Sequence, residues 1–214
     1  MLNRVPLQAV LFDWDGTLLD SYQSDARAYV AMFAKLGIPW NIADLEKHYS
    51  PDWHRVYRAA SLPKSQWTTA DRWWRHFYRG ERPALQPGAR RILQRLAGGY
   101  RLALVTGGSA WRVRAQLRAA ALTTLFETRV FADDTPKRKP HPAPLHLALS
   151  RMDCPTDACV YVGDTPEDVE MARSAGMPVV GIVGHSPVVA RLRAARPDAL
   201  VERLAELPAL LSRL

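Results

Sequence analysis

The chain has 214 residues, 48% of them hydrophobic and 23% charged, with a formal net charge of +8. This balance is typical of a globular domain with a sizeable core, and it excludes a disordered chain, a collagen-like repeat and a disulfide scaffold. No apolar run reaches the roughly 18 residues of a transmembrane helix, and Met1–Gln8 lacks the charged-then-apolar layout of a signal peptide. We therefore expect a cytoplasmic protein without a membrane partner.

Six short apolar segments alternate with helical patterns along the chain. The predicted strands are 9–12, 102–105, 128–132, 159–162, 179–183 and 199–201. The central segments are continuously apolar, which favours strands buried on both faces, as in a parallel sheet. Strand–helix alternation predicts an α/β, doubly wound, Rossmann-like domain.

Residues 20–86 interrupt this alternation with helical patterns only. Four helices are predicted there: from residue 20 or 21 to 36, from about 41, from about 51, and over about 65–79. We expect an all-helical cap domain at 20–86 without strands, inserted into a core domain formed by 1–19 and 87–214. Such an insertion, joined by two linkers, suits a lid over a site.

Most of the basic side chains are predicted to be solvated. Two helices are expected to expose arginines: Arg112, Arg114 and Arg118 on one, and Arg191, Arg193 and Arg196 on the other. Scattered positive charges without a nucleic-acid motif disfavour a nucleic-acid partner. Cys154 and Cys159, the only cysteines, are predicted to be structural thiols.

Polar side chains follow three of the predicted strands. Asp13 and Asp15 follow the first, Thr106 the second and Asp164 the fourth. Ligands of open α/β sheets bind at the carboxyl ends of the strands, so these groups are expected to meet in one crevice. Gathered carboxylates repel one another, and a hard cation such as Mg²⁺ relieves the repulsion.

The segment 13–17 carries the sharpest motif, Asp13-Trp14-Asp15-Gly16-Thr17. In an extended segment, side chains two positions apart share a face, and a turn at Gly16 can bring both carboxylates over the strand end. One carboxylate can attack as a nucleophile and form an aspartyl-phosphate. The other can protonate the leaving group and then activate water, while amides around Trp14 and Asp15 can bind phosphate oxygens.

The segment Thr106-Gly107-Gly108-Ser109 lies between a predicted strand and a helix. A hydroxyl and free amides at a helix N-terminus form a phosphate cradle. Gly-Gly turns are common, so this motif is weak by itself.

Two further segments supply charge. Lys137 and Lys139 lie in a basic loop, and a lysine can neutralise the charge of a transferring phosphoryl group. Asp164 is the predicted metal ligand of the fourth strand, and Asp168, four residues later, is expected to orient it or a metal-bound water.

In their order along the chain, these motifs resemble the haloacid dehalogenase superfamily of phosphotransferases. The resemblance covers residues 13–176 and rests on 13–21, Thr106, Lys139-Pro140 and Asp164. It implies that Asp13 is the nucleophile, Asp15 the general acid and base, and Lys139 rather than Lys137 the family lysine. Mg²⁺ is implied on the side chains of Asp13 and Asp164 and the carbonyl of Asp15. The implied phosphate contacts are Trp14, Gly16, Thr17, Thr106, Gly107 and Gly108.

The helical insertion and the sequence of residues 139–145 resemble the phosphoglycolate phosphatase-like branch, whose members carry a helical cap. This branch also includes pyrophosphatases and sugar-phosphate enzymes. Two positions depart from the family pattern. Gly107 replaces a frequent Asn, and Asp25 stands where the β-phosphoglucomutase branch has a cap histidine, which disfavours a mutase.

The expected activity is Mg²⁺-dependent hydrolysis of a small phosphomonoester, with phosphoglycolate as the first candidate. Pyrophosphate and a sugar phosphate are the alternatives, as is a protein that binds a phosphate ligand without turnover. Positive side chains of the cap can pair with a carboxylate or a second phosphate: Arg55, Arg58, Arg72, Arg75 and His76. A monomer or homodimer is expected.

Overall fold

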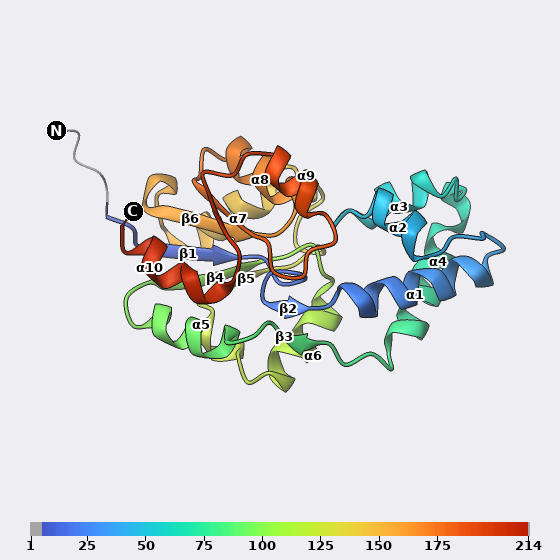
Figure 1. Ribbon diagram of the computed structural model, residues 1–214, viewed down its shortest axis with the longest axis horizontal. Helices are drawn as coiled ribbons and strands as arrows, with labels where there is room; N and C mark the ends of the chain where they lie inside the picture. The colour runs from blue at the N-terminus through green and yellow to red at the C-terminus, as the bar shows by residue number, and fades with distance from the viewer. Residues whose placement is uncertain (1–5, 214) are drawn as a thin grey trace.

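The computed structural model describes residues 6–213, so Met1–Val5 of the N-terminal stretch and Leu214 lie outside the described residues. Within this range one parallel sheet has the strand order β5-β4-β1-β6-β7-β8 (Figure 1). Its strands are β1 (Ala9–Phe12), β4 (Arg101–Val105), β5 (Thr128–Val130), β6 (Cys159–Gly163), β7 (Val179–Ile182) and β8 (Ala199–Val201). Each predicted strand is confirmed, with ends that differ by at most a residue or two.

Helices cover both faces of the sheet. One face packs against α5 (Ala89–Ala97), α6 (Ala110–Ala119) and α10 (Leu207–Leu211), and the other against α7 (Ala143–Met152), α8 (Pro166–Ser174) and α9 (Val189–Ala194). Alternation along β1 explains the two layers, because Val10 and Phe12 enter the first core and Ala9 and Leu11 the second. Short 3₁₀ helices cover Thr123–Leu125, Thr156–Ala158 and Leu204–Glu206. The predicted α/β, doubly wound fold is confirmed.

Four helices form a second group, on the right of Figure 1, away from the sheet. They are α1 (Tyr22–Lys35), α2 (Ile42–His48), α3 (Trp53–Ala59) and α4 (Trp67–Tyr78), the last preceded by a 3₁₀ turn at Lys64–Gln66. Their apolar side chains form a separate core that includes Met32, Phe33 and Val56, with Trp67 and Trp74 packed against it. We call residues 20–86, which contain these helices, the cap.

A two-stranded antiparallel ribbon joins the cap to the sheet domain. It pairs β2 (Leu19–Asp20) with β3 (Ala84–Leu85). The prediction that residues 20–86 contain no strand is therefore wrong. Each strand has only two residues, too few for an alternating pattern to be read from the sequence.

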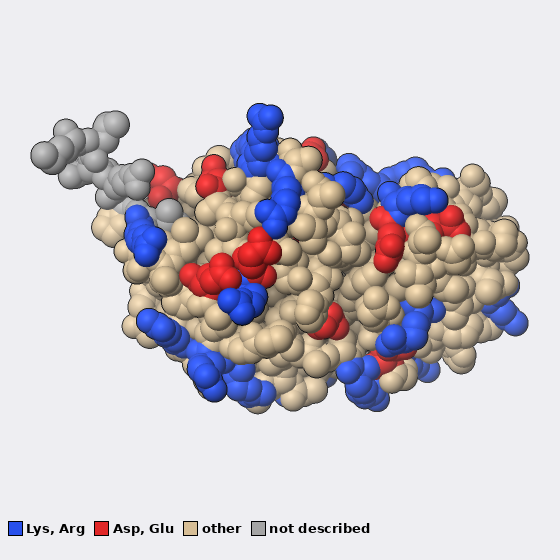
Figure 2. All heavy atoms as spheres, viewed as in Figure 1, with Lys and Arg blue, Asp and Glu red and all other residues tan. Residues whose placement is uncertain are grey.

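Basic side chains are spread over the face shown in Figure 2 and alternate with acidic ones. Arg114 and Arg118 are exposed as predicted, but Arg112 is only 6% exposed. The prediction of a solvated Arg112 is therefore wrong, for a reason that lies in the site described below. Cys154 and Cys159 are buried and form no disulfide, and the Cys159 thiol donates to Cys154 Sγ at 3.3 Å. No helix in the described part of the chain is long and apolar enough to cross a membrane.

Candidate active site

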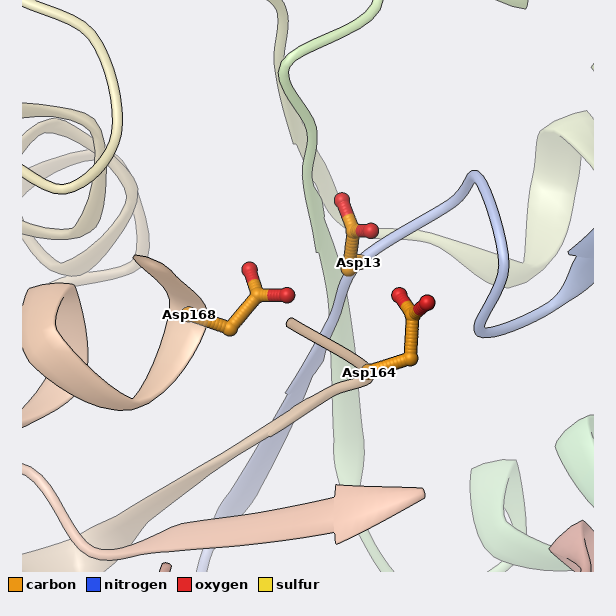
Figure 3. Close-up of side chains that lie close together, drawn as sticks. All are labelled: Asp13, Asp164 and Asp168. Carbon is orange, nitrogen blue, oxygen red and sulfur yellow. The ribbon is translucent and has the colours of Figure 1, made fainter. Parts of the chain in front are cut away.

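Three carboxylates meet at the carboxyl end of the sheet. Asp13 follows β1, Asp164 follows β6, and Asp168 lies in the first turn of α8. Figure 3 shows the three side chains turned toward one another, and their oxygen atoms lie within 4.8 Å of one another. All three are buried. The parallel pairing of β1 with β6 produces this meeting, since both strands end at the same edge.

Lys139 lies between two of these carboxylates. Its Nζ donates to Asp13 Oδ1 at 2.6 Å, to Asp168 Oδ1 at 2.7 Å and to the Tyr161 hydroxyl at 2.7 Å. Although burial opposes it, the charges of Asp13 and Asp168 hold the pKa of Lys139 above its ordinary value. The side chain therefore stays protonated. Lys137 is exposed, so Lys139 is the lysine that the fold brings to the site.

Asp168 is saturated by protein donors. Its Oδ1 accepts from Lys139 and from the Tyr161 hydroxyl. Its Oδ2 accepts from the amide and the hydroxyl of Thr165, the N-cap of α8, at 3.0 and 2.7 Å. Its oxygens lie near those of Asp13 and Asp164, but its bonds go to Lys139, Tyr161 and Thr165, and none goes to Asp164, which it was predicted to orient.

Asp13 and Asp164 are short of positive charge. Burial raises the pKa of Asp13 to about 7 against the opposing charge of Lys139. Burial and the nearby Asp13 carboxylate raise the pKa of Asp164 well above its ordinary value. Asp164 Oδ1 accepts one bond, from the Thr17 hydroxyl at 3.0 Å. No described amide donates to the carbonyl of Asp15. Two carboxylates and a free carbonyl are oxygen donors that a hard divalent cation prefers, so this cluster can hold a metal ion.

Gly16 makes room for this cluster. It adopts φ +77°, and a Cβ at this position would lie 2.2 Å from Asp164 Oδ2. Its amide donates to the Leu19 carbonyl, and its carbonyl accepts from Gln86 Nε2 at 3.1 Å. Glycine is required here both for the left-handed turn and for the close approach of Asp164.

Asp15 has a different partner, Arg112 of α6. The guanidinium donates to both carboxylate oxygens, at 2.7 and 2.6 Å. Burial opposes the effect, but this charge and its hydrogen bonds keep the pKa of Asp15 below its ordinary value. The rings of Trp74 and Tyr78 in α4 lie 5.8 and 5.3 Å from the guanidinium carbon. Arg112 can be buried because the Asp15 carboxylate and the two rings take the place of the water that would otherwise solvate its guanidinium. The side chain thereby links the cap to the predicted acid/base residue.

The glycine-rich turn after β4 contacts both domains. The buried Thr106 hydroxyl accepts from the Gly108 amide at 2.9 Å. A Cβ on Gly107 would lie 3.2 Å from the carbonyl oxygen of Pro51 in the cap. A Cβ on Gly108 would lie 2.6 Å from Arg112 Nη2. This turn is therefore restricted to small residues by the cap on one side and by Arg112 on the other.

The predicted phosphate-binding amides differ in how they are used. The amides of Gly16 and Gly108 are bonded within the protein, as described above, whereas the amides of Trp14 and Asp15 donate to no other described residue. The side chain of Trp14 is fully buried and donates from Nε1 to Gln116 at 2.9 Å. The amides of Trp14 and Asp15 therefore remain free for a ligand, as do those of Thr17 and Gly107 among the described residues.

A cavity of about 110 Å³ extends from these groups toward the cap. Its core end includes Asp13, Asp15, Gly107, Gly108 and Arg112, and its cap end includes Asp25, Tyr29, Tyr49, Trp53, Asp71, Trp74 and Arg75. Of the five positive cap side chains singled out in the sequence, only Arg75 lines this cavity. The cap end is therefore mostly aromatic and acidic.

Asp25 is the one acidic residue of the cap end that is nearly fully buried, with 6% exposure. Burial raises its pKa to about 8, and the Asp15 carboxylate contributes to the rise. Its Oδ1 has no hydrogen-bond partner among the described residues, and the same holds for the indole Nε1 atoms of Trp53 and Trp74. Sequence reasoning marked Asp25 only as a departure from a family pattern.

Known proteins resemble this chain over most of its length. A family model described as haloacid dehalogenase-like hydrolase matches residues 10–182. A plasmid-encoded phosphoglycolate phosphatase of Cupriavidus necator is 34% identical over 218 residues, 97% of this chain and 94% of that protein. Pyrophosphatase PpaX of Bacillus velezensis is 27% identical over 202 residues, 93% of this chain and 94% of that protein.

A solved structure extends the likeness to three dimensions. The crystal structure of CbbY from Rhodobacter sphaeroides in complex with phosphate superposes with a TM-score of 0.78 and 25% identity. The match covers 94% of this chain and 96% of that one. The order of the motifs, the strand order and the match to residues 10–182 agree, and the chain belongs to the haloacid dehalogenase-like hydrolase family.

Proposed function

We propose that this protein is a Mg²⁺-dependent phosphatase that hydrolyses the phosphomonoester of a small metabolite through an aspartyl-phosphate on Asp13. The observation that carries the proposal is the unequal pairing of two neighbouring carboxylates. Asp13 lies beside the buried cation of Lys139 and the metal-binding oxygens, whereas Asp15 is held by Arg112. One carboxylate is thus placed to attack and the other to handle protons.

In the first step, a carboxylate oxygen of Asp13 forms a bond to phosphorus while the bond to the leaving oxygen breaks. Asp15, which must be protonated in the substrate complex for this step, gives its proton to that oxygen, so the alcohol leaves neutral. In the second step, Asp15 takes a proton from water as the water oxygen attacks phosphorus and the aspartyl–phosphorus bond breaks. The pairing with Arg112 favours the ionised form of Asp15 that this second step requires.

The remaining groups bind the phosphoryl oxygens. Mg²⁺, when bound by Asp13, Asp164 and the carbonyl of Asp15, supplies positive charge to these oxygens and to the nucleophile. The protonated Lys139 adds a second positive charge beside Asp13. Thr106 and the free amides of Trp14 and Asp15 are the proposed neutral donors.

The cap, residues 20–86, is the proposed lid. The close contact of Pro51 with Gly107 supports this role, because it places a cap loop directly over the glycine turn. A closed lid excludes water and restricts the substrate to a small molecule. We expect a monomer or homodimer in the cytoplasm.

Phosphate release tests the proposal. Wild-type protein is assayed with p-nitrophenyl phosphate, phosphoglycolate, pyrophosphate and a sugar phosphate, with Mg²⁺ and with EDTA. We expect turnover that EDTA abolishes and added Mg²⁺ restores. Asp13→Asn is expected to lower kcat at least about 10⁴-fold with an unchanged unfolding temperature, and Asp15→Asn to accumulate the aspartyl-phosphate.

Two outcomes contradict the proposal. An active Asp13→Asn variant would rule out the nucleophile. Folded, Mg²⁺-bound protein that releases no phosphate from any ester would favour a phosphate-binding protein without turnover or a mutase that needs an activator.

A further inference from the structure

The cap end of the cavity faces the part of the substrate that leaves. The reacting carboxylates are at the core end, so the alcohol released from phosphorus must occupy the space between them and the cap helices. The side chains of that space therefore determine which alcohol fits. Four of them are aromatic: Tyr29, Tyr49, Trp53 and Trp74.

Positive charge at this end is already committed or exposed. Both terminal nitrogens of Arg112 are bonded to Asp15. Arg75 is exposed, and its guanidinium carbon lies 5.6 Å from the ring centroid of Trp111. Among the residues that line the cavity, the Nε atom of Arg112 is the one buried cationic donor without a partner that the carboxylate of phosphoglycolate or the second phosphate of pyrophosphate would find.

Acidic side chains and unpaired polar atoms are present instead. Asp25 and Asp71 both line the cap end. Asp71 Oδ1 accepts from the Tyr57 hydroxyl at 2.9 Å, whereas Asp25 Oδ1 has no partner in residues 6–213. The raised pKa of Asp25 reports surroundings that disfavour a negative charge, and a second anion beside it would meet the same penalty.

We infer that the leaving group carries no negative charge and donates a hydrogen bond to Asp25, as the hydroxyl of a polyol or the ammonium of an amino alcohol does. This inference rests on the proposed phosphatase function and makes Asp25 a specificity-determining residue. A donor at this position satisfies the buried Oδ1 atom. The surrounding rings suit both sources, because they pack against CH groups and attract an ammonium.

The first measurement compares kcat/KM of the wild-type protein for five phosphorylated substrates with Mg²⁺. They are glycerol phosphate, phosphoethanolamine, phosphoglycolate, pyrophosphate and p-nitrophenyl phosphate. We expect glycerol phosphate or phosphoethanolamine to exceed both anionic substrates by about 10-fold or more, since an unpaired buried polar group costs about that much. The ranking of these two distinguishes a polyol from an amino alcohol.

Two variants test the assigned residue, and one serves as a matched control. Asp25→Ala is expected to reduce the preference over phosphoglycolate about 10-fold for either source. Asp25→Asn keeps an acceptor but cannot ionise beside a bound ammonium, so it should reduce the preference for phosphoethanolamine more than that for glycerol phosphate. Glu46→Gln removes an exposed acidic charge of α2 outside the cavity lining and should leave the preference unchanged.

The alternative is that Arg75 reads a carboxylate. In that case wild-type protein prefers phosphoglycolate, and Arg75→Gln selectively lowers kcat/KM for it; either result overturns the inference. A preference that Asp25→Ala leaves intact overturns the role of Asp25. Failure to hydrolyse any of the five substrates, p-nitrophenyl phosphate included, overturns the phosphatase function and the inference with it. Hydrolysis with a preference for phosphoglycolate or pyrophosphate overturns the inference alone.

Discussion

The two ends of the cavity are built in opposite ways. At the core end, buried charges are paired at short distances, as in Lys139 with Asp13 and Asp168, and Arg112 with Asp15. At the cap end, rings surround a carboxyl oxygen and two indole nitrogens that have no partner in the described chain. Most ionic groups of the core end are thus paired within the protein, whereas the polar atoms of the cap end are left for a ligand. Substitutions at the core end should lower kcat, and those at the cap end should change substrate preference or KM.

The largest effect is expected from Lys139→Ala. Loss of this ammonium leaves Asp13 and Asp168 without their buried cation, and we expect kcat to fall about 10³-fold. The exposed Lys137→Ala variant is the control and should stay within about twofold of wild type. The unfolding temperature of the same samples separates lost catalysis from lost stability. Equal kcat values for the two variants would contradict the assignment of the lysine.

Gly16→Ala is expected to weaken metal binding about 10–100-fold, because the new Cβ displaces Asp164. Titration of activity and of binding heat with Mg²⁺ measures the loss. Gly176→Ala is the matched control, since Gly176 has φ +70° but nothing within 4 Å of its Cβ position. Equal affinity of the two variants for Mg²⁺ would contradict the expected displacement of Asp164.

Arg112→Lys is expected to lower kcat for an alkyl phosphate about 10-fold, because lysine cannot hold both oxygens of Asp15. The loss should be smaller with p-nitrophenyl phosphate, whose leaving group needs less protonation. The same substitution at the exposed Arg114 should affect neither substrate. An equal loss on both substrates would show that Arg112 acts through the fold rather than through Asp15.

The smallest effect is expected from Trp53→Phe, which keeps a ring and removes an unpaired indole donor. We expect KM to change about two- to fivefold at constant kcat. Trp67→Phe is its counterpart, since Trp67 Nε1 donates to the Leu62 carbonyl at 3.1 Å. That variant should lose about 1 kcal/mol of unfolding free energy and keep its KM. A lower kcat for Trp53→Phe would contradict the claim that substitutions at the cap end change KM or substrate preference and leave kcat unchanged.

Much of the core end follows from the sequence. Continuous apolar runs predict the parallel strands, and parallel strands bring Asp13 and Asp164 together wherever they lie in the chain. Lys139 comes from a loop, and no periodicity places it there. Its selection over Lys137 comes from the resemblance to a family, and the structure then places it beside Asp13.

The burial of Arg112 could not be predicted from the sequence. This residue borders the apolar positions Val113 and Leu117, where a polar side chain usually faces water. Its burial depends on Asp15, Trp74 and Tyr78, which are distant in the sequence. One signal was available, because Gln116 lies four residues later on the same side and also accepts from Arg112. The partners of Asp25 are equally long-range, so its role could not be derived from spacing.

The ribbon of β2 and β3 has a consequence for how this protein can be rebuilt. Leu19 pairs with Leu85 and Asp20 with Ala84, so the chain leaves and re-enters the sheet domain at adjacent residues. A two-residue hairpin turn can close such an antiparallel pair. The whole segment between Asp20 and Ala84 is thus exchangeable for a turn, or for another cap, without a change in the connectivity of the sheet. Deletion of the cap at this one position would leave the sheet domain and its site in place and give bulkier phosphoesters access to it.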